Sequence, residues 1–309
     1  MIKNKPVIYI VGPTASGKTS ISVELAKIFD GEIVSGDSMQ IYKGMHIAAA
    51  APDEEEKRGI PHHLFEFLNP NEKFSVCEYV KLANSVIDDI HKRGKLPIVV
   101  GGTGLYVDAL AQNLIFDSET SDLNIRKELE AEAEKEGLDK LYEYLKTIDH
   151  KSAQKISSSD KKRIIRAIEI YKISGKTKTE CDELSKNVGA IYDNLFLGLN
   201  YADREVLYNR INKRVDIMLE NGLIDEARNA FGNFSGTATQ AIGHKELFKY
   251  FNGNMSIDEA LEHLKMQTRR YAKRQLTWFR KNDNINWIFM DKEQNPIECA
   301  KRVINEFLF

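Results

Sequence analysis

Near its N-terminal end the chain reads Val7-Ile8-Tyr9-Ile10-Val11-Gly12-Pro13-Thr14-Ala15-Ser16-Gly17-Lys18-Thr19. The β-branched run 7–11 predicts a buried strand, and residues 12–19 complete the pattern G-x-x-x-x-G-K-[ST] just before a helical pattern. Such a loop curls so that its backbone N–H groups and the start of the next helix face a phosphate. We predict that residues 12–19 bind a phosphorylated small molecule, with Lys18 at the outer phosphate and the Thr19 hydroxyl placed for Mg²⁺.

The nearest useful acid to this loop is Asp37. A phosphate-binding loop that acts on ATP is normally accompanied by a hydrophobic strand that ends in an aspartate. The best candidate strand, 96–100, is followed instead by Gly101-Gly102-Thr103-Gly104, whereas Asp37 follows the strand at 32–34. This pattern favours a diphosphate that leaves over an ATP that is hydrolysed.

The composition excludes strong attraction of the whole surface to nucleic acid. The chain has 309 residues, with 44 Lys and Arg against 46 Asp and Glu, so its formal net charge is −2. Any binding of nucleic acid must therefore come from local basic patches. Cys77, Cys181 and Cys299 show no metal-type spacing and favour reduced thiols. No apolar run approaches the roughly 20 residues that span a membrane, so we expect a cytoplasmic protein that is not bound to membranes.

Strand and helix patterns alternate over the first 116 residues. Strands are expected at 7–11, 32–35 and 96–100, and helices at 17–29, 75–93 and from 105 onward. This alternation predicts an α/β fold with a parallel sheet covered by helices, of the P-loop NTPase type. Strand patterns return at 194–200 and 286–290, so we assign residues 1–116 and 189–309 to one catalytic core.

Residues 117–188, between these two parts, lack strand patterns. Charged helical segments are expected at 126–136, 138–148 and 160–174, which predicts an all-helical insertion. After the insertion, helices are expected at 203–221, at 223–232 and from 256 to about 281, followed by a closing helix.

The helix that begins near residue 256 carries a dense basic cluster. Its members are Arg269, Arg270, Lys273, Arg274, Arg280 and Lys281, with Tyr271, Trp278 and Phe279 between them. One interpretation is a solvated basic face whose aromatic residues turn to the core, and the other is a platform for a phosphate backbone. The insertion carries a second group at Lys161, Lys162, Arg163 and Arg166. Two patches far apart in the sequence favour a polyanion held between core and insertion.

Three further features allow more than one interpretation. Arg210 and Arg214 share one helix face and could pair with Asp203 or Glu205 on the surface, or hold a diphosphate. The adjacent histidines 62 and 63 point in different directions on any regular element, which argues against a metal site. The acidic run 53–56 suits the first turn of a helix.

Seven motifs in this order resemble the tRNA dimethylallyltransferase family, which prenylates N6 of adenine-37 beside the anticodon. They lie at 12–19, 37–45, 61–64, 101–106, 210–226, 240–246 and 268–280, so the resemblance covers nearly the whole chain. It implies a P-loop core with a helical insertion, dimethylallyl diphosphate as the donor, Mg²⁺ as the cofactor and a monomeric enzyme that binds the tRNA anticodon stem-loop.

The resemblance also implies roles for individual residues. Asp37 takes the proton of the adenine amine and Thr103 assists near the leaving oxygen, while Lys18, Arg210 and Arg214 stabilise the diphosphate. The residues expected to bind tRNA are Asp37, Ser38, Met39, Gln40, Thr103, Arg126, Lys162, Arg163, Arg166, Gln240, Gly243, Lys245, Lys273, Arg274, Gln275, Thr277, Trp278 and Arg280.

The chain departs from the family pattern at two places. Where the family reads DIGTAKP, this chain has His46-Ile47-Ala48-Ala49-Ala50-Ala51-Pro52, and His244 stands where a tyrosine is usual. Three alternatives remain open: an adenylate isopentenyltransferase acting on free AMP or ATP, a P-loop small-molecule kinase, and a non-catalytic nucleotide-binding module. The insertion and the basic cluster favour tRNA as the acceptor.

Overall fold

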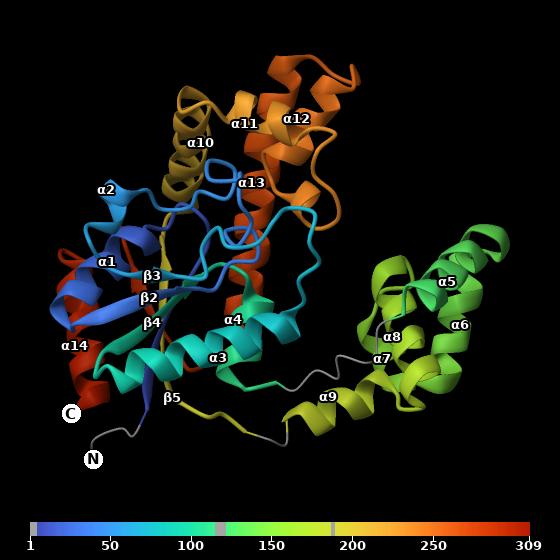
Figure 1. Ribbon diagram of the computed structural model, residues 1–309, viewed down its shortest axis with the longest axis horizontal. Coiled ribbons are helices and arrows are strands. Elements are labelled where there is room, and N and C mark those ends of the chain that lie inside the picture. The colour runs from blue at the N-terminus through green and yellow to red at the C-terminus, as the bar shows by residue number, and fades with distance from the viewer. Residues whose placement is uncertain (1–4, 115–121, 187–188) are drawn as a thin grey trace. The chain divides into compact units, whose positions relative to one another are not determined.

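The computed structural model describes residues 5–114, 122–186 and 189–309 (Figure 1). The chain forms two compact units, one made of residues 1–111 and 191–309 and the other of residues 112–190. The boundaries predicted at residues 117 and 188 lie outside the described residues. Among the described helices, none has the length and apolar character needed to cross a membrane.

A parallel sheet forms the centre of the first unit, as predicted (Figure 1). Its strands are β1 (Pro6–Val11), β2 (Gly31–Ser35), β3 (His62–His63), β4 (Leu96–Gly101), β5 (Asp193–Asn200) and β6 (Ile285–Phe289). Within the described residues they are ordered β3-β2-β4-β1-β5-β6, and every neighbouring pair is parallel. The loops after β2, β4, β1 and β5 therefore meet at one edge, where parallel sheets bind their ligands.

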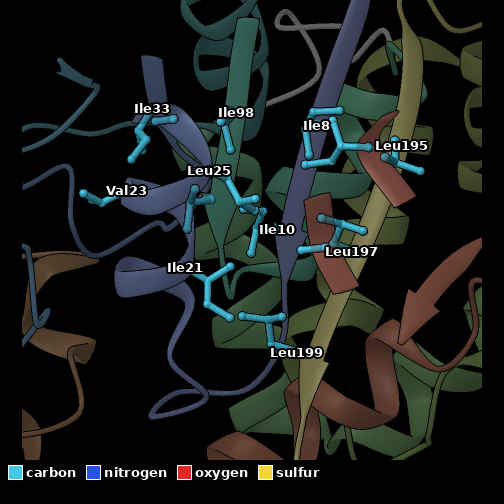
Figure 2. Close-up of a cluster of buried hydrophobic side chains, with 14 of the residues drawn as sticks. Ile8, Ile10, Ile21, Val23, Leu25, Ile33, Ile98, Leu195, Leu197 and Leu199 are labelled. Atoms are coloured by element: carbon cyan, nitrogen blue, oxygen red, sulfur yellow. The ribbon is translucent and has the colours of Figure 1, made fainter. Parts of the chain in front are cut away.

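One face of the sheet packs against α1 (Lys18–Ile28) and α14 (Pro296–Leu308). Figure 2 shows alternate residues of β1, Ile8 and Ile10, beside Leu195 and Leu197 of β5, with Leu25 of α1 in the same apolar layer. The alternation arises because successive side chains of a strand point to opposite faces. This layer fixes the start of α1, and with it the phosphate-binding loop, against the carboxyl end of β1.

The other face is covered by α3 (Val76–Lys92) and α4 (Gly104–Ala111). Ser75 and Glu78 form the expected capping box at the start of α3. Tyr79 of α3 stacks on Tyr106 of α4, and its hydroxyl donates a 3.0 Å hydrogen bond to the carbonyl oxygen of Ser35. The buried tyrosine pair therefore connects both helices to the end of β2, immediately before Asp37.

The helices α10 (Arg204–Glu220), α11 (Leu223–Ala230), α12 (His244–Phe251) and α13 (Ile257–Phe279) complete the first unit, together with α2 (Glu54–Lys57) and the short 3-10 helix at Ala238–Gln240. Helices α10 and α13 pack on each other, and α10, α11, α12 and α13 share one apolar core. The capping box at Ser256 and the acidic first turn of α2 were both predicted correctly. Helix α12 was not predicted, because the glycine before it gives no side-chain cap signal.

The second unit is helical, as predicted. It contains α5 (Leu123–Glu136), α6 (Leu138–Ile148), α7 (His150–Lys155), α8 (Lys161–Ser174) and α9 (Lys178–Lys186). Helices α7 and α9 were not predicted from the sequence. Leu129, Leu141, Leu145, Ile164 and Ile168 are all 2% exposed or less and form a core within the unit. This unit thus buries its own apolar side chains.

Candidate active site at the carboxyl edge of the sheet

The phosphate-binding loop passes close to the neighbouring strand β5. Gly12 has a φ of +145°, and a Cβ atom there would lie 2.3 Å from the carbonyl oxygen of Leu199, so only glycine fits. Ser16 is fully buried, and its hydroxyl oxygen has no hydrogen-bond partner among the described residues. A buried polar atom without a partner is costly in a finished core, but it suits a loop that awaits phosphate oxygens.

Lys18, at the first position of α1, folds back over this loop. Its Nζ donates to the carbonyl oxygens of Gly12 and Pro13 at 3.0 and 2.8 Å. Burial and the positive charge of Arg214 lower the pKa of Lys18 to about 7, while Asp37 opposes the shift. A diphosphate bound here would restore the charged ammonium, since a nearby anion favours the protonated form.

Asp37 is held in a fixed position at the end of β2. Its Oδ1 accepts a 2.9 Å hydrogen bond from the backbone N–H of Met39, and its own N–H donates to the hydroxyl of Ser35 at 3.3 Å. Burial raises the pKa of Asp37, while the Met39 hydrogen bond and the charge of Lys18 act against the rise. The carboxyl group is thereby a stronger base than an exposed aspartate.

Thr103 lies beside the Asp37 loop. Its hydroxyl oxygen accepts the backbone N–H of Ser38 at 3.0 Å and lies 3.2 Å from the Ser38 hydroxyl. These contacts join the loop after β2 to the glycine-rich turn after β4. The structure thus brings Lys18, Asp37 and Thr103 together at one edge of the sheet, as the motifs predicted.

Gln275 of α13 connects the two glycine-containing loops. Its Oε1 accepts the N–H of Thr14 at 2.9 Å, and its Nε2 donates to the carbonyl oxygen of Gly102 at 3.0 Å. A Cβ atom at Gly102 would lie 2.1 Å from that Nε2, so this approach requires glycine. Gln275 was predicted to bind tRNA, but the structure shows a buried amide that orders the phosphate-binding loop; a tRNA contact stays a prediction.

Two aromatic residues of α13 face the same region. Burial and the nearby Asp37 carboxylate raise the pKa of Tyr271, while hydrogen bonds with Thr103 and Gln275 oppose that shift. The indole N–H of Trp278 donates to Asp108 Oδ2 at 2.7 Å. Tyr271 was not among the predicted site residues, although its place inside the basic motif was the available signal.

Arg210 and Arg214 of α10 both reach loops near the phosphate site. Arg210 Nε donates to the carbonyl oxygen of Ala15 at 3.1 Å, and Arg214 Nη2 lies 3.5 Å from that of Ala50. Burial lowers the pKa of Arg214. Asp203 caps the helix instead of pairing with either arginine. In the described part of the chain no ion pair joins Arg210 or Arg214 to Asp203 or Glu205. The interpretation that these arginines form surface ion pairs was therefore wrong.

The basic cluster of α13 divides into exposed and packed members. Arg270, Lys273, Arg274, Arg280 and Lys281 are exposed, whereas Ala272, Gln275 and Phe279 are buried. Arg269 instead donates to Asn212 Oδ1 at 2.6 Å. A cavity of about 470 Å³ opens beside this face, lined by Lys273, Thr277 and Arg280 and by residues of β5 and α10. The exposure of these side chains fits both interpretations of the cluster, and its contact with tRNA stays a prediction.

The predicted tRNA contacts of the second unit differ in their surroundings. Arg126 and Arg166 both form 2.8 Å ion pairs with Glu169, whose side chain is fully buried. Arg163 pairs with Asp160 at 3.1 Å, and no ion pair of Lys162 is seen in residues 122–186. The buried glutamate therefore gives two of these arginines a structural role, and their contact with tRNA stays a prediction.

The remaining predicted tRNA residues, Gln240, Gly243 and Lys245, lie just before α12 and in its first turn. Lys245 is exposed and donates to Gln240 Oε1 at 3.2 Å. Gly243 has a φ of +113° and is the N-cap residue of α12. Its N–H donates a hydrogen bond to the Glu246 carboxylate. These residues are placed on the first unit, and a contact with tRNA again stays a prediction.

The adjacent histidines 62 and 63 each contact a different partner within the protein. His62 bonds to the carbonyl oxygen of Ile60 and His63 to Glu32, both at 2.7 Å. In the described ranges there is no group of three or more His, Cys, Asp or Glu that could hold a metal. Mg²⁺ is often held by one or two protein oxygens together with substrate phosphates, and the Thr19 hydroxyl at the start of α1 fits that arrangement.

Comparison with known proteins agrees with this geometry. The IPP transferase family pattern matches residues 40–282, and the isopentenyl transferase pattern matches 5–65. A tRNA dimethylallyltransferase from Caldanaerobacter subterraneus is 47% identical over 96% of both chains. The crystal structure of the Bacillus halodurans tRNA isopentenylpyrophosphate transferase is 43% identical, with a TM-score of 0.74 over 99% of this chain and 97% of that one.

A further solved structure is that of a eukaryotic dimethylallyltransferase acting on tRNA. It is 31% identical, with a TM-score of 0.84, and the match covers 98% of this chain and 79% of that one. Because the family pattern spans most of the chain and full-length relatives exceed 40% identity, this chain belongs to the IPP transferase family, as a tRNA dimethylallyltransferase-type prenyltransferase.

Proposed function

We propose that this chain transfers the dimethylallyl group of dimethylallyl diphosphate to N6 of adenine-37 in tRNA. The observation that carries the proposal is that Lys18, over the phosphate-binding loop, and the Asp37 carboxylate lie at the same carboxyl edge of the sheet, where each charge acts on the pKa of the other. Lys18 suits the stabilisation of a leaving diphosphate, and Asp37 suits the acceptance of a proton. The allylic C–O bond breaks with its electron pair on the diphosphate, the N6–C bond forms, and the N6 proton passes to Asp37.

The leaving-group side consists of the phosphate-binding loop and cations. Charge develops on the diphosphate as the C–O bond breaks, so fixed donors aimed there stabilise the transition state. Lys18, Arg210 and Arg214 supply positive charge from α1 and α10. Thr19 would hold Mg²⁺ with diphosphate oxygens, and the bound ion would neutralise part of the developing charge.

The acceptor side consists of Asp37 and the residues that follow it. The adenine amine is a poor nucleophile because its lone pair is delocalised into the ring, so a nearby carboxylate must accept its proton. An adenine in the anticodon loop has to leave its stack to reach a half-buried carboxylate. We assign the holding of the displaced base to Ser38, Met39 and Gln40, which directly follow Asp37 in the chain.

Two rival functions predict different substrates. An adenylate isopentenyltransferase would prenylate AMP or ATP, and a P-loop kinase would transfer the terminal phosphate of ATP. We expect radiolabelled dimethylallyl diphosphate to label tRNA in the presence of the protein, and to leave AMP and ATP unlabelled. Labelled AMP or ATP without labelled tRNA would favour the first rival, and ATP turnover without prenyl transfer would favour the second.

We expect simultaneous replacement of Arg270, Lys273 and Arg274 by alanine to weaken tRNA binding. Each lost phosphate contact should lower the slope of log affinity against log salt by about 0.7–0.9. Filter binding at several salt concentrations measures that slope. The fold should survive because all three side chains are exposed.

The matched control replaces Lys27, Lys81 and Lys92, which are exposed lysines of α1 and α3. This control removes three positive charges as well. It should leave the slope of log tRNA affinity against log salt at the wild-type value. If both triple variants lose the same affinity, the effect comes from net charge and the α13 face has no special role.

We expect a variant in which a Gly/Ser linker replaces residues 112–190 to bind the diphosphate but not tRNA. The phosphate-binding loop, Asp37 and Thr103 all belong to the first unit, whereas Lys162 and Arg163 belong to the second. Because the second unit has its own apolar core, its removal should leave the sheet folded. Calorimetry with the diphosphate and filter binding with tRNA measure the two affinities. If this variant binds tRNA as tightly as wild type, the prediction is wrong and the first unit alone recognises tRNA.

A further inference from the structure

A glutamate of α11 anchors the loop in which this chain departs from its family pattern. Glu226 Oε2 accepts the backbone N–H of Ile47 at 2.7 Å, and its Oε1 accepts that of Ala48 at 2.9 Å. Hydrogen bonds to an ionised acceptor are about twice as strong as neutral ones. One carboxylate therefore fixes two successive peptide groups of the loop 46–51.

His244 of α12 holds that carboxylate from the other side. Its Nε2 lies 2.9 Å from Glu226 Oε1, and the residue is fully buried. The imidazole also packs against the rings of Phe234 and Phe248, with ring centroids 6.1 and 6.0 Å away. The carboxylate is therefore restricted on both sides.

The carbonyl groups of the same loop face the reaction site. Gln40 Nε2 donates to the carbonyl oxygens of Ala49 and Ala50 at 3.4 and 3.2 Å, and Arg214 Nη2 approaches that of Ala50 at 3.5 Å. Ala50 adopts a left-handed φ of +48°. Its carbonyl oxygen thus contacts one residue from the acceptor side and one from the leaving-group side.

The contacts continue from Gln40 to the proposed base. The Ser35 hydroxyl donates to Gln40 Oε1 at 3.1 Å and accepts the N–H of Asp37 at 3.3 Å. A continuous series of hydrogen bonds therefore runs from Glu226 through the loop to Asp37, with a branch to Arg214.

We infer that Glu226 is a positioning residue for prenyl transfer: by anchoring the loop 46–51 it orients Gln40 and Arg214 together. Glu226 itself touches no reacting atom. The inference rests on the proposed function where it is tested by the rate of prenyl transfer. It also explains how a loop of four alanines can serve the site, because Ala48, Ala49 and Ala50 make the contacts used here through their backbone groups.

The test compares Glu226→Ala and Glu226→Gln with wild type and with Asp225→Ala. Asp225 is an exposed acid of the same helix turn, and its side chain makes no hydrogen bond within the described residues. We expect Glu226→Ala to lower kcat/KM for the diphosphate about 10- to 100-fold, the scale of losing hydrogen bonds to a charged group. The KM for tRNA should stay within about twofold. Glu226→Gln keeps one acceptor oxygen and the side-chain volume, so its kcat/KM should lie between those of Glu226→Ala and wild type. The kcat/KM of Asp225→Ala should match wild type.

Non-additivity separates positioning from general stabilisation. In a Gln40→Ala, Arg214→Ala background, Glu226→Ala should lower kcat/KM by less than about twofold, because the groups through which it acts are absent. Full additivity, or wild-type kcat/KM in Glu226→Ala, would overturn the inference. His244→Phe keeps the aromatic packing and should give a smaller loss than Glu226→Ala.

Two readouts do not depend on prenyl transfer. The backbone amides of Ile47 and Ala48 should exchange hydrogen faster in Glu226→Ala than in wild type, and calorimetry should show weaker diphosphate binding through displaced Arg214. If wild type transferred no prenyl group, the proposed function would fail while these readouts still decide the inference. Unchanged exchange and unchanged diphosphate affinity would overturn it.

Discussion

Asp37→Ala should transfer the prenyl group about 10²- to 10⁴-fold more slowly than wild type, the usual contribution of a general base. Diphosphate affinity should be retained or slightly increased, because the substitution removes a negative charge that acts on Lys18. Single-turnover transfer at saturating tRNA and calorimetry with the diphosphate measure the two quantities separately.

Asp37→Asn is the matched variant, because its side-chain oxygen can still accept the N–H of Met39 and keep the loop in place. If Asp37→Asn slows prenyl transfer as much as Asp37→Ala does, the loss comes from the missing proton acceptor and not from the loop contact. The wild-type rate should fall as pH drops through the raised pKa of Asp37, since only the ionised carboxylate accepts a proton. Near-normal turnover in either variant would remove Asp37 from the mechanism.

Lys18→Ala should weaken diphosphate binding and slow prenyl transfer together. The ammonium interacts with the diphosphate in the ground state and more strongly as charge develops on it, so both quantities depend on it. Calorimetry gives the affinity and single-turnover kinetics gives the rate. If neither changes, the loop at 12–19 does not hold the leaving diphosphate.

The lowered pKa of Lys18 adds a proton-linkage result to this prediction. At pH 8 the ligand-free side chain is mostly neutral, because its pKa is about 7. Diphosphate binding should raise that pKa and take up about one proton per site in wild type. Lys18→Met should take up almost none. Calorimetry in buffers of different ionisation enthalpy counts the protons, and equal uptake by both proteins would assign the linkage to another group.

The same pKa has a consequence for the stability of the ligand-free protein. The folded pKa lies below the usual 10.5, so the unfolded chain binds more protons between these two values. Lys18 therefore makes stability rise with pH from about 7 to about 10.5. Below pH 7 the buried ammonium opposes folding.

The sequence predicted those parts of the fold that depend on local pattern. The strand, loop and helix at residues 7–28 were recognised because β-branched residues, glycines and a helical pattern follow one another directly. The capping boxes at Ser75 and Ser256 placed two helix starts correctly. The parallel sheet followed from the alternation of strands and helices, and its carboxyl edge then brought Lys18, Asp37 and Thr103 together.

Contacts between residues far apart in the chain could not be predicted in this way. Gln275 was recognised as part of a motif, but its bonds to Thr14 and Gly102 depend on how α13 packs against the sheet. Glu226 likewise reaches a loop that lies 178 residues away in the sequence. Short elements such as β3 and α7 have too few residues to show a period. The ion pair of Arg126 with Glu169 joins two different helices, so no local pattern marked it.

The most direct test of the account is the position of the prenyl group in the product. Wild-type protein, dimethylallyl diphosphate and unmodified tRNA would be incubated, and the tRNA would be digested and analysed by mass spectrometry. We predict one dimethylallyl group on N6 of adenine-37, and none when a tRNA with guanine at position 37 is used. A prenyl group elsewhere in the tRNA, or equal modification of the guanine-37 tRNA, would contradict the account.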